Sequence, residues 1–86
     1  MITNEDVMTN KERYDQVFME CFAVDKGVLN GTFVYQSVPS WDSVGHMAMI
    51  AALEDAFSIS METDDIIDLG SYTKGMEILA KYDVAF

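Results

Sequence analysis

Apolar residues recur near the start of the chain at intervals of three and four, the spacing of one face of an α-helix. This first set comprises Val7, Tyr14, Val17, Phe18, Cys21 and Phe22. Polar and charged residues occupy the positions between them, so the segment reads as amphipathic. Thr3 or Asn4 can supply the N-cap, because short polar side chains accept hydrogen bonds from the first turn. We predict a helix from Asn4 to about Val24.

The next segment, residues 25–40, reads DKGVLNGTFVYQSVPS and predicts a loop. Its Asn30-Gly31 pair is a turn signal, and Pro39 stops regular structure. Loops of this length in small domains tend to be functional or to carry short structure of their own. Residues 32–35 resemble a short strand, but no second strand is predicted to pair with them. We expect four apolar side chains to hold the loop against the helices: Val28, Leu29, Phe33 and Val34.

A second helix is predicted from Ser43 to Phe57. One broad face of it carries Met47, Met49, Ile50, Leu53, Ala56 and Phe57. The other face carries Val44, Ala48, Ala51, Ala52 and Asp55. A solvent-facing side would ordinarily carry Lys, Glu or Gln. The second face is therefore either rich in alanine for helix propensity, packed on another helix, or a docking surface, and the acids at its end favour docking.

Two shorter helices follow. The sequence ETDDIIDLG predicts a brief helix with Thr63 or Asp64 at its cap and Gly70 as terminator. The last helix is predicted from Ser71 to about Tyr82. Its apolar stripe consists of Tyr72, Met76, Leu79 and Tyr82. The order of long helix, long loop, long helix, very short helix and medium helix predicts an all-α fold, a small antiparallel four-helix bundle that forms one domain over residues 1–86.

The charge of the chain limits the classes of partner that we expect. Fifteen acids against five bases give a net charge of −10. Nucleic acids and anionic membranes bind basic surfaces, so we predict neither as a partner. No Lys or Arg lies between Lys26 and Lys74, whereas seven acids do. This interval is either a solvated face that keeps the protein soluble or a docking surface for basic partners.

The beginning of the sequence has no basic region followed by an apolar run, and no stretch is long and apolar enough to cross a bilayer. We therefore expect a soluble, cytoplasmic protein without membrane insertion, and a monomer. Cys21 is the only cysteine, which excludes an intramolecular disulfide. Its place among apolar residues predicts a small buried side chain.

Enzymatic signatures are absent. His46 is the only histidine and has no cysteine or second histidine to share a metal ion with. Ser43 and His46 lie on one helical turn, where they cannot supply nucleophile, base and oxyanion hole. The acids of the third helix do not match a calcium-binding loop, and the glycines have no phosphate-binding spacing. We predict no catalytic activity, no metal site and no nucleotide site.

One motif remains, Asp42-Ser43-Val44, at the predicted start of the second helix. The N-terminus of a helix presents unpaired N–H groups and a positive partial charge. Phosphate groups bind favourably there. A serine at the end of a long loop is also accessible, which suits covalent attachment of a phosphate-linked group better than catalysis.

This motif resembles that of the acyl carrier proteins and the related peptidyl carrier domains, whose second helix opens with Asp-Ser and an apolar residue. The resemblance continues through IAALEDAFSISM, with matches at Ile50, Leu53, Glu54, Asp55, Phe57, Ile59 and Met61. With the short acidic helix and the final helix, it extends over nearly the whole chain. Gly45, His46 and Ala48 depart from the pattern of fatty-acid carriers, as does Val44, and are closer to specialised stand-alone carriers.

The resemblance implies that Ser43, next to Asp42, carries 4′-phosphopantetheine transferred from coenzyme A by a phosphopantetheinyl transferase. The thiol of this arm would hold an acyl or aminoacyl group as a thioester. An acyl- or aminoacyl-activating ligase would load it, and acyl transferase or synthase enzymes would receive it, in fatty acid or polyketide synthesis or in a specialised cell-surface or secondary pathway.

The resemblance also implies a docking face for these enzymes, formed by Val44, Ala48, Ala51, Glu54, Asp55 and Glu62. Four methionines provide either an adaptable interior for an acyl chain or ordinary core filler: Met47, Met49, Met61 and Met76. The alternative to a carrier is an acidic helical adaptor without a prosthetic group, in which Ser43 is only a helix cap.

Overall fold

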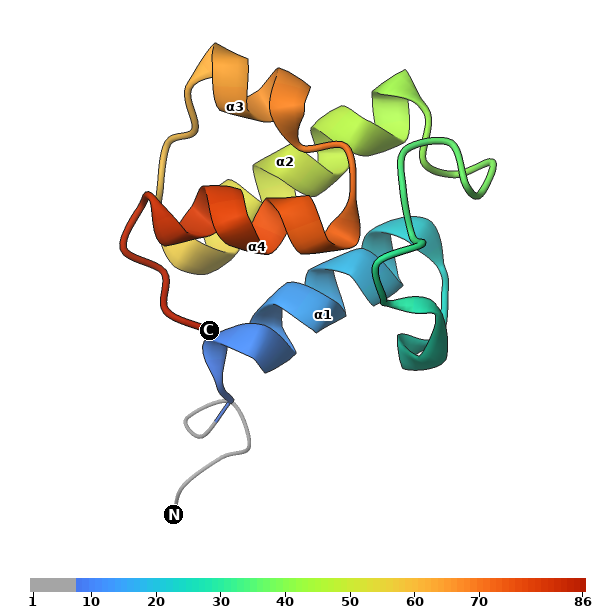
Figure 1. The fold of residues 1–86 in the computed structure, drawn as a ribbon, viewed down its shortest axis with the longest axis horizontal. Helices are drawn as coiled ribbons and strands as arrows, with labels where there is room; N and C mark the ends of the chain where they lie inside the picture. Colours follow the sequence, from blue (N-terminus) through green and yellow to red (C-terminus); the bar gives the residue numbers. More distant parts are fainter. Residues whose placement is uncertain (1–7) are drawn as a thin grey trace.

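The computed structural model describes residues 8–86. In this part the chain forms four α-helices and one short 3-10 helix: α1 (Asn10–Phe22), η2 (Lys26–Val28), α2 (Ser43–Phe57), α3 (Thr63–Asp68) and α4 (Tyr72–Ala80). Figure 1 shows α2 and α4 running back against the direction of α1, with α3 above them. Residues 8–86 contain no strand beyond an isolated bridge. The predicted small all-helical bundle is confirmed at this level.

The helix α1 begins later than predicted. Thr9 is its N-cap: the Thr9 hydroxyl accepts a hydrogen bond from the Glu12 amide (3.1 Å), and the Glu12 carboxylate accepts one from the Thr9 amide (2.9 Å). This reciprocal pair is a capping box, which fixes a helix start. A continuous helix from Asn4 is therefore wrong at residues 8 and 9, and the predicted caps Thr3 and Asn4 lie outside the described residues.

The other three helices lie where the hydrophobic pattern predicted them. The bounds of α2 are the predicted ones. The N-cap position of α3 is Glu62 rather than Thr63 or Asp64. The hydroxyl of Ser71 caps α4, which ends at Ala80, slightly short of the predicted end. Cys21 in α1, predicted to be buried, is half-buried. This partial burial raises the pKa of its thiol.

Trp41 lies at the centre of the core. Its side chain is fully buried. The indole stacks on the ring of Phe22, with centroids 4.9 Å apart, and contacts the rings of Phe33 at 5.2 Å and Phe18 at 5.6 Å. Buried aromatic side chains contribute the largest apolar areas in a small core. The cluster therefore joins α1, the long loop and the start of α2.

The long loop is fixed to the connection between α3 and α4. The Tyr35 amide donates to the Gly70 carbonyl and the Tyr72 amide to the Phe33 carbonyl, both at 2.9 Å. These bonds flank a bridge between Val34 and Ser71. The strand-like residues 32–35 thus have a pairing partner, which the sequence pattern did not predict because one bridge leaves no periodicity.

The loop's apolar side chains divide into two groups. Phe33 is buried and Leu29 half-buried, as predicted. Val28 and Val34 remain 43% and 39% exposed, so the prediction that they hold the loop is wrong. The ring of Phe33 joins the aromatic cluster around Trp41.

A buried polar network connects α1 to α4. Asp15 is 1% exposed and accepts hydrogen bonds from the Tyr72 hydroxyl and from Lys11 Nζ, the latter at 3.0 Å. The Tyr14 hydroxyl donates to the Tyr72 carbonyl at 2.6 Å. Burial raises the pKa of the Tyr14 phenol well above its ordinary value, which keeps the donor protonated. Buried polar groups of this kind stabilise the fold only while each has its partner.

Gly75 tests this contact between α1 and α4. A Cβ at Gly75 would lie 2.0 Å from the Tyr14 hydroxyl oxygen, which cannot withdraw without breaking its bond to Tyr72. We expect Gly75→Ala to lower the free energy of unfolding by about 1–3 kcal/mol, against the helix propensity of alanine. Gly27→Ala is the matched control, since no atom lies within 4 Å of its Cβ. Urea denaturation measures both, and equal midpoints would contradict the close packing of α1 on α4.

Candidate functional site

Ser43 is the first residue of α2, and Asp42 is its N-cap. The Asp42 carboxylate accepts a hydrogen bond from the Gly45 amide at 2.8 Å, and the Asp42 carbonyl accepts one from the His46 amide at 2.7 Å. The alternative interpretation of Ser43 as only a helix cap is therefore wrong, because Asp42 takes that role. Its exposed hydroxyl lies 3.2 Å from the hydroxyl of Tyr35, within hydrogen-bond distance.

Gly45 is required because the loop crosses close over the first turn of α2. A Cβ at Gly45 would lie 1.9 Å from the backbone oxygen of Ser40. The Ser40 hydroxyl in turn donates to the carbonyl of Phe22 at 3.0 Å, at the end of α1. Because Gly45 has no Cβ, the backbone of Ser40 can pass close to the first turn of α2, where Ser43 lies.

His46 connects the core to α3. The Trp41 indole N–H donates to His46 Nδ1 at 3.0 Å, and because an indole nitrogen is a donor only, Nδ1 carries no proton. The proton of the neutral ring is then on Nε2, which lies 2.8 Å from the Ile66 carbonyl and donates to it. Both nitrogens are committed, so the imidazole is not placed to take a proton from Ser43.

A hollow of about 330 Å³ lies beside Ser43, between α2, α3 and the loop. It is lined by Tyr35, Ser43, His46, Met47, Ile66, Ile67, Leu69 and Gly70. Most of its lining is apolar, with the Ser43 and Tyr35 hydroxyls among the polar groups. Met47 is 52% exposed at this hollow, so its interpretation as core filler is wrong. Met49 and Met61 are buried core residues.

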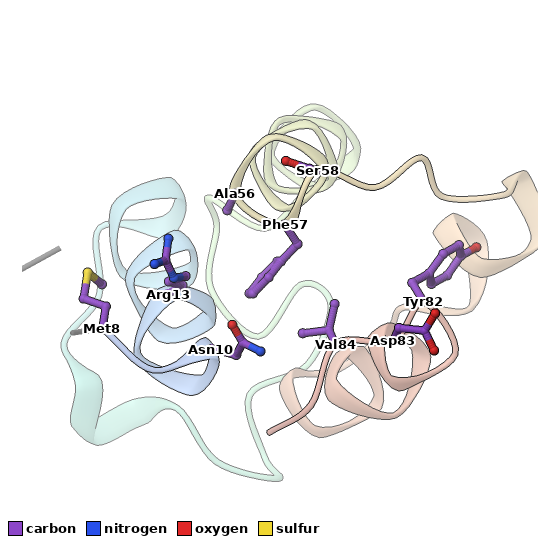
Figure 2. Close-up of a pocket in the computed structure, with 9 residues that line it drawn as sticks. All are labelled: Met8, Asn10, Arg13, Ala56, Phe57, Ser58, Tyr82, Asp83 and Val84. Carbon is purple, nitrogen blue, oxygen red and sulfur yellow. The ribbon is translucent and has the colours of Figure 1, made fainter. Parts of the chain in front are cut away.

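A second hollow, of about 320 Å³, lies at the other end of α2. Figure 2 shows that its lining side chains come from Met8 and the start of α1, from the C-terminal end of α2 with Ser58, and from the segment after α4. It lies near Ser58, which follows the 15 residues of α2, about 22 Å along the helix from Ser43 at 1.5 Å per residue. None of the predicted site residues lines it.

The predicted docking residues of α2 form one exposed stripe. Val44, Ala48, Ala51 and Asp55 are all exposed, and Val44 is 79% exposed. Spacings of four, three and four residues place them on one side of a helix. The interpretation that this face packs on another helix is wrong for these four residues. Glu62 is also exposed, at the start of α3.

Glu54 has a different environment from the other docking candidates. It is half-buried, and its carboxylate accepts a hydrogen bond from the Met61 amide at 2.9 Å. Its carbonyl accepts a second bond, from the Ile59 amide at 3.0 Å. Glu54 therefore holds the connection between α2 and α3.

The acids of α3 are not equivalent. Asp65 is buried and accepts hydrogen bonds from Lys81 Nζ and the Tyr82 hydroxyl, which lower the pKa of its carboxyl group. Asp64 and Asp68 are exposed. Across residues 8–86, no three His, Cys, Asp or Glu side chains are grouped so that they could hold a metal ion. None of the helices in this part of the chain could span a bilayer.

Comparisons with known proteins give no match: no family model fits the sequence, and no curated protein or solved structure is similar to it. The assignment of a function accordingly rests on the residues described above. Sequence reasoning found Asp42 and Ser43 but missed Tyr35, which lies in the loop without any periodic or motif signal.

His46→Ala tests the connection between the core and α3. The change leaves the Trp41 indole N–H and the Ile66 carbonyl without their partner, at a cost of about 1–3 kcal/mol for a buried group. We expect faster hydrogen exchange of the α3 amides and a changed emission of Trp41, the only tryptophan.

Met47→Ala is the control for this variant, because Met47 lines the same hollow and is 52% exposed. It removes a side chain of similar size from the neighbouring position without removing a polar contact. Unchanged α3 exchange in His46→Ala, or an equal increase in Met47→Ala, would contradict the role given to the imidazole.

Proposed function

We propose that this protein is a carrier of the acyl-carrier-protein type, in which Ser43 bears 4′-phosphopantetheine. The proposal rests on the position and exposure of the Ser43 hydroxyl. It is exposed at the first residue of α2, it is released from capping by Asp42, and it lies beside an apolar hollow. The acyl-carrier-like topology of the bundle is part of this proposal.

The residues present fit such a group. The amides of Ser43 and Val44 lie in the first turn of α2, where the helix itself offers no acceptor four residues earlier. They and the positive end of the helix dipole favour a phosphodiester on Ser43. The hollow of about 330 Å³ provides apolar surface for the arm or the first part of its cargo. When bound, the group supplies a thiol that holds an acyl or aminoacyl group as a thioester.

Attachment requires little of this chain. Ser43 Oγ forms a bond to the pantetheine-side phosphorus of coenzyme A, the phosphoanhydride bond breaks, and adenosine bisphosphate leaves with the electron pair. The hydroxyl proton passes to a base on the transferase, because both nitrogens of His46 are engaged within the chain. The chain supplies the nucleophilic oxygen and its position, and the partner enzyme supplies the catalysis.

The partners of this proposal dock on the exposed face around Ser43. Val44, Met47 and Ile67 are 79%, 52% and 72% exposed and offer apolar contact area. Asp55 and Glu62 add negative charge in an interval without Lys or Arg. Basic surfaces on the transferase, the activating ligase and the acyl transferase or synthase enzymes complement it, which favours fast association and release.

A second candidate function is an acidic helical adaptor. The same exposed face supports it, since docking on Val44 and Asp55 requires no prosthetic group. The two functions differ in one measurable property, the covalent modification of Ser43.

Co-expression with a phosphopantetheinyl transferase, followed by intact mass measurement, tests the proposal. We expect one phosphopantetheine adduct on the wild type and none on Ser43→Ala, because the reacting oxygen is lost. Ser71→Ala is the matched control: Ser71 also stands at the start of a helix, where its hydroxyl accepts a hydrogen bond from the Lys74 amide. The absence of an adduct on the wild type, or an adduct that survives Ser43→Ala, would refute the carrier assignment.

Charge reversal tests the docking face. The double variant Asp55→Lys with Glu62→Lys should slow modification by the transferase on the order of tenfold at low ionic strength, and salt should reduce the difference. Glu20→Lys is the control, since it makes the same change per site at an exposed position of α1. Initial rates over a salt series measure the effect. Equal rates for the control and the double variant would exclude the docking face.

A further inference from the structure

Tyr35 is the side chain in contact with the Ser43 hydroxyl, and its position is set by the core. Its hydroxyl lies 3.2 Å from Ser43 Oγ. Its ring makes edge contacts with the rings of Trp41, centroids 6.4 Å apart at 87°, and His46, 5.8 Å apart at 84°. The ring is therefore fixed on two sides, and its hydroxyl lies at the candidate site.

The backbone on both sides of Tyr35 is fixed as well. The Tyr35 amide donates to the Gly70 carbonyl at 2.9 Å. Gln36 has φ 66°, in the left-handed region that non-glycine residues rarely adopt. The Gln36 amide donates to the Trp41 carbonyl at 3.0 Å, which closes the turn. A residue persists in this region only where its surroundings determine it, so the loop holds Tyr35 in one place.

Among the described residues that line the hollow beside Ser43, none is Lys or Arg. The sequence has no Lys or Arg from residue 27 to residue 73. His46 donates its Nε2 proton to the Ile66 carbonyl. A phenol is neutral and can donate as well as accept, so the Tyr35 hydroxyl can bond to Ser43 Oγ before modification and to an acceptor-only group afterwards.

We infer that Tyr35 is the positioning residue of this site: its hydroxyl hydrogen-bonds the free Ser43 hydroxyl and, once a phosphodiester stands on Ser43, donates to a phosphate oxygen. The inference rests on the proposed function. The bond places the base of the phosphate-linked arm at the mouth of the apolar hollow that Tyr35 and Ser43 line together. Because the donor is neutral, it orients the phosphodiester without clamping it by charge.

The test compares modified wild type with modified Tyr35→Phe by ³¹P NMR. Phenylalanine keeps the ring that packs on Trp41 and His46 and removes only the hydroxyl. We expect the adduct to form on both proteins, and the ³¹P resonance to shift and sharpen in Tyr35→Phe as the phosphodiester becomes freer. Thr32→Val is the control, because it removes an exposed hydroxyl of the same loop that bonds to Asn30 and does not line the hollow beside Ser43. Its ³¹P resonance should equal that of the wild type.

A second measurement uses the wild type alone and serves if Tyr35→Phe does not fold. Through-space magnetisation transfer from the phosphorus to the ring protons of Tyr35 is expected. An unchanged ³¹P resonance in folded Tyr35→Phe, or no transfer to Tyr35 in the wild type, would overturn the inference about Tyr35. As long as the adduct forms, neither result contradicts the proposed carrier function. The lack of any adduct on the wild type overturns both.

Discussion

The burial of Trp41 is the constraint on which the rest of this structure depends. Its ring packs against the rings of Phe22 and Phe33, and its position one residue before Asp42 fixes where α2 begins. Its backbone carbonyl closes the turn at Gln36, and its indole N–H orients His46. The first turn of α2 and the loop that faces it are thus positioned by one buried side chain. A site built on such contacts is preorganised even though its hydroxyl is exposed.

Through His46, the position of Trp41 also affects α3, which is too short to be stable by itself. A six-residue helix has too few backbone hydrogen bonds to offset the cost of forming it. It is held by side chains from other elements: His46 at the Ile66 carbonyl, Glu54 at the connection from α2, and Lys81 and Tyr82 at Asp65. One wall of the hollow beside Ser43 therefore depends on a few polar contacts. Segments held in this way open at lower free energy than the core does.

The sequence predicted the elements whose signals are local and repeated. The bounds of α2 followed from its apolar period, and the motif at Asp42 and Ser43 followed from its place before that period. The choice between these two neighbours as N-cap could not be predicted, because Asp and Ser cap helices equally well. The start of α1 was readable from the capping box at Thr9, but the earlier apolar residue Val7 extended the pattern past it. Tyr35 could not be predicted, since a loop eight residues upstream gives no register for its side chain.

The charge distribution explains why the proposed carrier would hold its phosphate-linked group by a covalent bond to Ser43. Between residues 27 and 73 the chain has no Lys or Arg, and five exposed acids in this interval repel a free phosphate-linked cargo: Asp42, Asp55, Glu62, Asp64 and Asp68. The amides of the first turn of α2 and the Tyr35 hydroxyl are neutral donors, and they cannot overcome that repulsion for a diffusible anion. A bond to Ser43 removes the need for affinity, because the group stays on the protein whatever its charge. The neutral donors then only orient it, and the acidic face remains available to attract basic partner enzymes and release them.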